Sequence, residues 1–198
     1  MGRKLVKDLK IALKDLEPRV KDLKFLLSGR EFHNFSMRPK EAWANWLLCA
    51  VLQKIHGDDI TFGDDEKGDG IFFDKKTGKW IGTEHVSALD NPSSLSTLPK
   101  GEARVIEAIN HKIKFGPTYA KNKFLIVFFD GAGEWRRDKV RESINDRHSF
   151  MGIFLIGLLW SNESGYAYSV TQLLRNDSIT YKIQINSDFN DWEVSRMI

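Results

Sequence analysis

Apolar residues recur at helical spacing in two segments of the first third of the chain. In residues 1–30, leucine, alanine and valine return every three or four positions, which predicts one helix, or two helices joined at Pro18. A second helix is predicted to start around Pro39, with Glu41 in its first turn, and to end at 57–59. Its predicted apolar face consists of Trp43, Trp46, Leu47, Ala50, Val51 and Ile55.

The pattern then changes to that of strands. A short strand at 60–62 precedes two segments, 70–74 and 79–88, which flank the turn-like tetrapeptide Lys75–Gly78 and predict a β-hairpin. The later predicted elements are a helix, a strand covered on both faces, a polar helix, a buried strand and two peripheral strands, at 102–115, 124–129, 138–148, 152–160, 166–174 and 179–186. This order predicts a mixed α/β sheet flanked by helices.

Length and composition are consistent with that picture. The 198 residues are 41% apolar, which is enough for a core and excludes intrinsic disorder. We expect an N-terminal helical arm at 1–35 and an α/β domain at 36–198, together forming one compact unit. Cys49 is the only cysteine, which excludes an internal disulfide and a cysteine-based zinc site. Without a recognisable signal peptide or membrane span, the chain is expected to be soluble and cytoplasmic.

The charges are unevenly placed along the sequence. Thirty Lys and Arg against 27 Asp and Glu give a net charge of +3, which excludes a histone-like polycation. Residues 1–30 carry nine basic and four acidic side chains, an excess of five positive charges. The arm is interpreted either as a packing element with a solvated basic face or as an arm that contacts phosphates.

Two acidic residues of the hairpin are candidates for a metal site. If Lys75–Gly78 closes the hairpin, Asp74 faces Lys79 and Asp69 faces Glu84, with Cβ atoms about 5 Å apart. Two such carboxylates repel each other unless a cation lies between them, and oxygen ligands favour Mg²⁺ or Mn²⁺ over zinc. The alternatives are a one-residue bulge, which would put the acids on opposite faces, and a frayed strand end with both acids solvated.

Three short motifs resemble the PD-(D/E)xK nuclease superfamily: Glu41 on its helix, Gly68-Asp69-Gly70, and Glu84-His85-Val86. The resemblance covers about residues 36–160, and the restriction-endonuclease-like fold has the same helix–strand–strand–strand–helix–strand order. It implies that Asp69 and Glu84 hold the metal, that Glu41 is a further ligand, and that the backbone carbonyl of His85 completes the set.

One position departs from the family pattern. The superfamily places lysine two residues after the glutamate, where this chain has Val86. Either the site is inactive or a lysine comes from elsewhere, and Lys112 is the candidate because it lies near the inward stripe of helix 102–115. The combination of Lys112, Lys114 and Tyr119 resembles relatives that have lost the strand lysine. The alternative is that Lys112 only flanks the apolar face.

The resemblance implies a Mg²⁺- or Mn²⁺-dependent nuclease that hydrolyses phosphodiester bonds of DNA or RNA, with Asp69, Glu84 and Lys112 as catalytic residues. The alternatives are an inactive nucleic-acid-binding or assembly module of the same fold and an interaction protein unrelated to nucleic acid. A homodimer is compatible with cutting a duplex, and the amphipathic N-terminal helix is the candidate contact.

His85 is expected to point away from Glu84 and to be buried and hydrogen-bonded. Trp135, beside Arg136 and Arg137, is either a base-stacking residue or part of a solvated loop.

Overall fold

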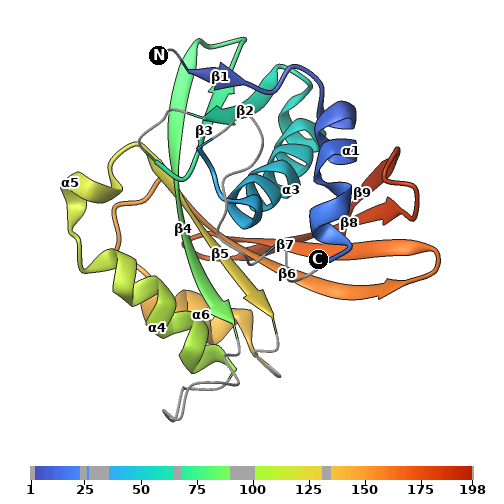
Figure 1. The fold of residues 1–198 in the computed structure, drawn as a ribbon. Helices are drawn as coiled ribbons and strands as arrows, with labels where there is room; N and C mark the ends of the chain where they lie inside the picture. The colour runs from blue at the N-terminus through green and yellow to red at the C-terminus, as the bar shows by residue number, and fades with distance from the viewer. Residues whose placement is uncertain are drawn as a thin grey trace.

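The computed structural model describes residues 3–22, 26, 36–64, 68–89, 101–130 and 135–197. In this part of the chain nine strands form one mixed sheet, and helices lie on both of its faces (Figure 1). The strands are β1 (Lys4–Leu5), β2 (Ile60–Asp64), β3 (Ile71–Asp74), β4 (Lys79–Leu89), β5 (Lys123–Asp130), β6 (Gly152–Asn162), β7 (Gly165–Leu173), β8 (Ser178–Asn186) and β9 (Trp192–Arg196). The helices are α1 (Leu9–Val20), α3 (Pro39–His56), α4 (Glu102–Ile113), α5 (Pro117–Ala120) and α6 (Arg137–Ile144).

The strands follow one another across the sheet in the order of the sequence, from β1 to β9. Strand β5 is parallel to both β4 and β6, and every other neighbouring pair is antiparallel. The two parallel connections carry α4 with α5, and α6, on the same face of the sheet (Figure 1). The mixed α/β architecture predicted from the order of elements is therefore confirmed.

The sheet separates two hydrophobic cores. Helices α1 and α3 pack on one face, and α4 and α6 on the other (Figure 1). Strand β5 shows the division, because Ile126 and Phe128 enter the first core while Leu125 and Val127 enter the second. The prediction that 124–129 is covered on both faces is confirmed.

Helix α3 is buried more completely than its predicted apolar stripe suggested. Every residue from Ala42 to Leu52 is buried, and the rings of Trp43 and Trp46 stack with centroids 5.3 Å apart. Ile55, assigned to the stripe, is 40% exposed instead, because it lies in the last turn beyond the sheet. Such all-round burial is typical of a helix enclosed by its own domain, and here the bent sheet encloses α3 (Figure 1).

The N-terminal helix is part of the same core. Asp8 caps α1 by accepting from the backbone N–H groups of Lys10 and Ile11, and Pro18 lies inside the helix. Leu13 and Leu16 are fully buried in the core shared with α3. This supports the packing interpretation of the arm, and it removes that apolar face as the contact for a homodimer.

The hairpin has the predicted register. Asp74 pairs with Lys79 and Ile71 with Gly82, across the four-residue turn 75–78. Gly78 closes the turn with a φ of 69° and donates its N–H to the carbonyl of Asp74 at 2.8 Å. The left-handed backbone at Gly78 makes glycine the preferred residue there.

We expect Gly78→Ala to lower the free energy of unfolding by about 1 kcal/mol, because a Cβ is disfavoured in the left-handed region. No heavy atom lies within 4 Å of that Cβ position, so the cost is conformational and not steric. Urea denaturation measures the difference, with Lys76→Ala at the exposed tip as the control. An unchanged midpoint for Gly78→Ala would contradict the turn geometry.

Three elements are absent from the sequence prediction: β1, α5 and β9. β1 has two residues and α5 has four, too few to establish a period, and β9 near the chain end pairs only with β8. Residues 90–100, and the glycine-containing segment 131–134, lie outside the described part. No helix in the described residues is long and apolar enough to cross a membrane.

Candidate active site

The candidate site lies where β3 and β4 separate. Pairing between these strands ends at Ile71 and Gly82, followed by one further bond, from the N–H of Thr83 to the carbonyl of Gly70 at 2.9 Å. Gly70 has a φ of 138°, so the backbone leaves the strand there. Asp69 is therefore not the paired strand residue that the register predicted. Instead its Oδ2 accepts from the backbone N–H of His85 at 2.6 Å, which keeps Asp69 beside β4.

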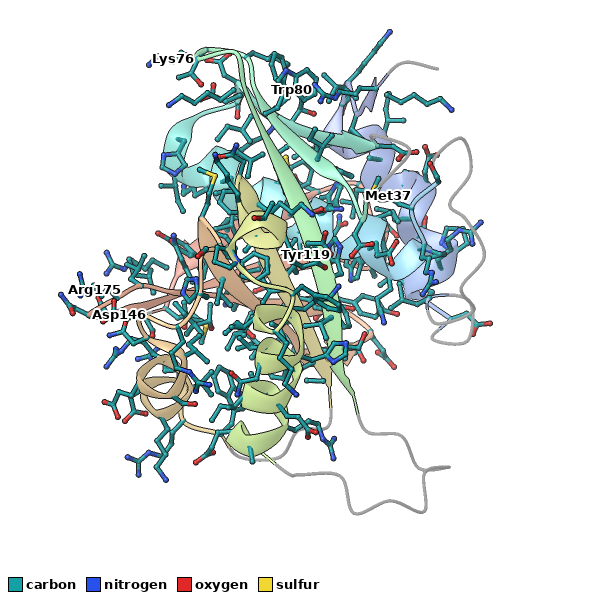
Figure 2. All side chains as sticks on the ribbon, turned by 90° about the vertical axis from the view of Figure 1, so that its left-hand side faces the viewer. Met37, Lys76, Trp80, Tyr119, Asp146 and Arg175 are labelled. Carbon is teal, nitrogen blue, oxygen red and sulfur yellow. The ribbon has the colours of Figure 1, made fainter. Side chains whose placement is uncertain are left out.

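Glu84 projects from β4 on the face covered by α4, and its side chain is 12% exposed. Its Oε2 lies 3.2 Å from Lys112 Nζ of α4 and also accepts from the hydroxyl of Tyr119. Its Oε1 lies 2.6 Å from Nζ of Lys123, the first residue of β5. Lys112 also donates to the Tyr119 hydroxyl at 3.1 Å. The predicted pairing of Lys112 with the site is thus present, and Figure 2 shows Tyr119 beside β4 on this side of the sheet.

Lys123 is a site residue that the sequence interpretation missed. In the parallel pair β4–β5, Gly82 lies next to Lys123 and Glu84 next to Leu125. Residues two apart in a strand share a face, so Lys123 lies on the same face as Leu125 and Glu84. The alternation of side chains along residues 123–129 could have predicted that Lys123 lies on the α4 face. Its position beside Glu84, however, depends on the pairing of β4 with β5.

The lysines determine the charge state of the two carboxylates. Burial alone would raise the pKa of Glu84, but hydrogen bonds from Lys123, Tyr119 and Lys112 outweigh it and hold this pKa below its usual value. For Asp69, burial is outweighed by the imidazole and backbone N–H of His85 and by the charge of Lys112, so its pKa is also lowered. Burial and the neighbouring Glu84 raise the pKa of Tyr119, which keeps its hydroxyl protonated.

These shifts predict a loss of stability in acid. A carboxylate whose pKa is lowered by folding stabilises the native state above its unfolded pKa, and this contribution disappears as the pH falls through the folded-state value. We expect the free energy of unfolding to fall between about pH 5 and pH 2, and to fall less in Glu84→Gln. Chemical denaturation at several pH values measures this, and parallel curves for the two proteins would contradict the charge assignment.

His85 lies on the opposite face of β4, as predicted, and is buried. Its Nδ1 is 3.7 Å from Asp69 Oδ2, too long for a hydrogen bond but within range of an ion pair. Neither ring nitrogen has a hydrogen-bond partner among the described residues, so the expectation of a hydrogen-bonded imidazole is wrong.

Glu41 and Lys40 approach the site from the start of α3. Glu41 accepts from the backbone N–H of Arg38 at 2.9 Å, so its carboxylate caps the helix. Lys40 donates to the Ser87 hydroxyl of β4. Burial lowers the pKa of Lys40, and the charges of Glu41 and Asp69 oppose that shift. Lys40 is a second lysine near Asp69 that the sequence interpretation did not include.

The donor atoms fit a hard cation only in part. Within the described ranges, no three His, Cys, Asp or Glu side chains are grouped closely enough to hold an ion. Asp69 and Glu84 offer carboxylate oxygens, the ligands that Mg²⁺ and Mn²⁺ prefer. Glu84 accepts three hydrogen bonds, and a carboxylate accepts about four. An ion held by Asp69 and Glu84 would therefore need main-chain oxygen and water to complete its coordination.

Trp135 does not present a free ring. It is partly buried in the core on the α4 face, and its ring meets Phe129 edge-to-face at 5.1 Å. This contact argues against the base-stacking interpretation of Trp135.

Searches against protein-family models, curated proteins and solved structures find no match to this chain.

Proposed function

We propose that the chain is a metal-dependent nuclease that hydrolyses phosphodiester bonds in nucleic acid, with DNA as the first substrate to test. The observation that carries this proposal is the bond between Lys112 and Glu84 where β3 and β4 separate, with the charge of Lys112 also lowering the pKa of Asp69. Carboxylates at the end of a hairpin beside a partly buried lysine are suited to metal-assisted phosphate chemistry.

The order of elements supports a restriction-endonuclease-like core. From α3 to β5 the chain runs helix, strand, strand, strand, helix, strand, apart from the four-residue α5. Strands β2, β3 and β4 form an antiparallel meander, and β5 is parallel to β4. This matches the order implied by the three motifs that resemble PD-(D/E)xK nucleases.

Each residue has a role in this proposal. Asp69, Glu84 and the main-chain carbonyl of His85 hold Mg²⁺ or Mn²⁺, and Glu41 is the further candidate. When bound, the ion polarises the phosphate and helps to neutralise the charge that develops on it. Lys112 would lie near the attacking water and the phosphate. Tyr119 holds Lys112 and Glu84 in place through its hydroxyl.

The test is cleavage of single-stranded, duplex and branched DNA and of RNA by the purified chain with Mg²⁺ or Mn²⁺. We expect cleavage that depends on the metal and stops with a chelator. If every substrate stays intact with both metals, the nuclease proposal is wrong.

A specific observation favours a second candidate, a nucleic-acid-binding module that does not cut. Val86 is partly buried against the core on the α4 face, where the superfamily has its lysine. The Glu84 carboxylate is already neutralised by two lysines. This candidate predicts salt-sensitive binding of nucleic acid without metal dependence and without cleavage.

A further inference from the structure

The corner of the molecule that joins α4 to β5 is basic and carries an exposed aromatic ring. Residues 108–129 contain four lysines and no acidic residue. Two of these lysines, Lys112 and Lys123, bind Glu84, while Lys114 and Lys121 are exposed. We call residues 111–123 the basic corner. Its excess positive charge complements a polyanionic backbone.

Phe115 lies in the middle of the basic corner and is 56% exposed. Its ring centroid is 4.9 Å from that of Tyr119 and 5.7 Å from that of His111. Tyr119 in turn donates to Glu84, so one ring separates Phe115 from the candidate active site. An exposed aromatic ring beside a basic surface is suited to stacking on a ligand that has a flat apolar face and a negative charge.

A second cluster of aromatic and basic side chains lies away from the candidate active site (Figure 2). At the β3–β4 hairpin, Trp80 stacks on Phe73 with centroids 4.2 Å apart, and the guanidinium of Arg3 lies 4.4 Å from the Trp80 ring centre. The Trp80 ring is thus partly covered, whereas Phe115 is 56% exposed. Figure 2 also shows Lys76 and Trp80 at the tip of the hairpin, well away from Tyr119.

We propose that Phe115 stacks on an unpaired nucleobase whose neighbouring phosphate is bound by the lysines of the basic corner. In a duplex the faces of the bases are covered by their neighbours, so only a single strand or an unpaired end can present a base to this ring. Aromatic stacking beside a basic groove is how proteins bind single strands without reading their sequence. The inference rests on the proposed function, because it names the substrate class of the same site: single-stranded nucleic acid.

The experiment measures binding without cleavage. Fluorescence anisotropy in the presence of a chelator measures the affinity of the full chain for labelled oligonucleotides of about 12 nucleotides. This length is within the usual site size of single-strand binders. The probes are single-stranded DNA, single-stranded RNA and the matching DNA duplex. We expect Phe115→Ala to weaken single-strand binding by about fivefold or more and to leave duplex binding unchanged.

Two further substitutions separate stacking from simple apolar contact. Phe115→Trp is expected to restore single-strand binding, whereas Phe115→Leu is not, because leucine has no ring. Leu159→Ala, at an exposed apolar position of β6, is the matched control and is expected to bind as the wild type. Lys114→Gln is expected to weaken binding of single strands and duplex alike and to reduce the dependence on salt.

The inference is overturned if Phe115→Ala binds single strands as the wild type, if it weakens single-strand and duplex binding equally, or if Phe115→Leu restores binding. If Phe115→Ala weakens binding of the single-stranded DNA and RNA probes equally, the result supports recognition of the base face. If it weakens binding of only one probe, that probe identifies the preferred nucleic acid. Because the assay contains no metal, its outcome is independent of cleavage. If the chain binds single strands as expected but never cuts them, the stacking site is supported and the nuclease proposal is wrong.

Discussion

Replacing Glu84 with glutamine is expected to lower metal-dependent cleavage by on the order of 100-fold or more, because the metal supplies several kcal/mol of charge stabilisation and loses a charged ligand. Glutamine has nearly the same shape but no charge, and it leaves Lys112 and Lys123 without their shared partner. Calorimetric titration with Mn²⁺ is expected to show weaker binding, and Asp69→Asn is expected to behave in the same way.

The control for this prediction is Glu163→Gln, in the exposed turn between β6 and β7. It removes the same charge at a position far from Glu84 in the fold, and we expect no change in cleavage or metal binding. Chemical denaturation shows whether Glu84→Gln still folds under the assay conditions. A folded Glu84→Gln protein that binds Mn²⁺ and cuts as the wild type would contradict the metal assignment.

Lys112 and Lys123 are expected to differ in their effect on cleavage, although both bind Glu84. The charge of Lys112 also acts on Asp69, and its side chain is 16% exposed against 31% for Lys123. Lys112 is therefore less exposed than Lys123 and acts on both carboxylates. We expect Lys112→Met to reduce cleavage by about 100-fold or more, in the range of general acid–base groups.

Lys123→Met is the matched variant for this comparison, because it removes the same kind of group from the other oxygen of Glu84. We expect it to reduce cleavage by less than Lys112→Met and to change Mn²⁺ binding in a calorimetric titration. Single-turnover measurements separate the chemical step from substrate binding. A larger loss of cleavage in Lys123→Met would make Lys123 the catalytic lysine in place of Lys112.

The elements of the core could be predicted because their signals are local. The spacing of apolar residues located α3 and α4, and the turn Lys75–Gly78 fixed the hairpin register, since each depends on residues close in sequence. The pairing of Lys112 with Glu84 could be predicted for a similar reason. Once α4 is placed on the sheet, the helical period puts Lys112 at the edge of its inward face.

The rest of the candidate site depends on contacts between distant segments. Lys123 reaches Glu84 only through the parallel pairing of β4 with β5, and parallel pairing leaves no turn in the sequence from which to count the register. The position of Asp69 depends on Gly70, the residue that follows it, where the backbone departs from the β3 pairing. Lys40, at the start of α3, meets Ser87 of β4, a contact that helical spacing does not predict.

The order of the strands has a consequence for how the molecule assembles. Each strand of the sheet pairs with the strand before it and the strand after it in the sequence, so no strand has to insert between two that are already paired. The sheet can therefore grow from one side as the chain leaves the ribosome, with α3 available before β2 and with β4 in place before β5. Apart from β1 and β2, neighbouring strands close comparatively short loops, which favours rapid folding. The pairing of Glu84 with Lys123 can form only after β5 joins, so the candidate site is completed midway through this assembly.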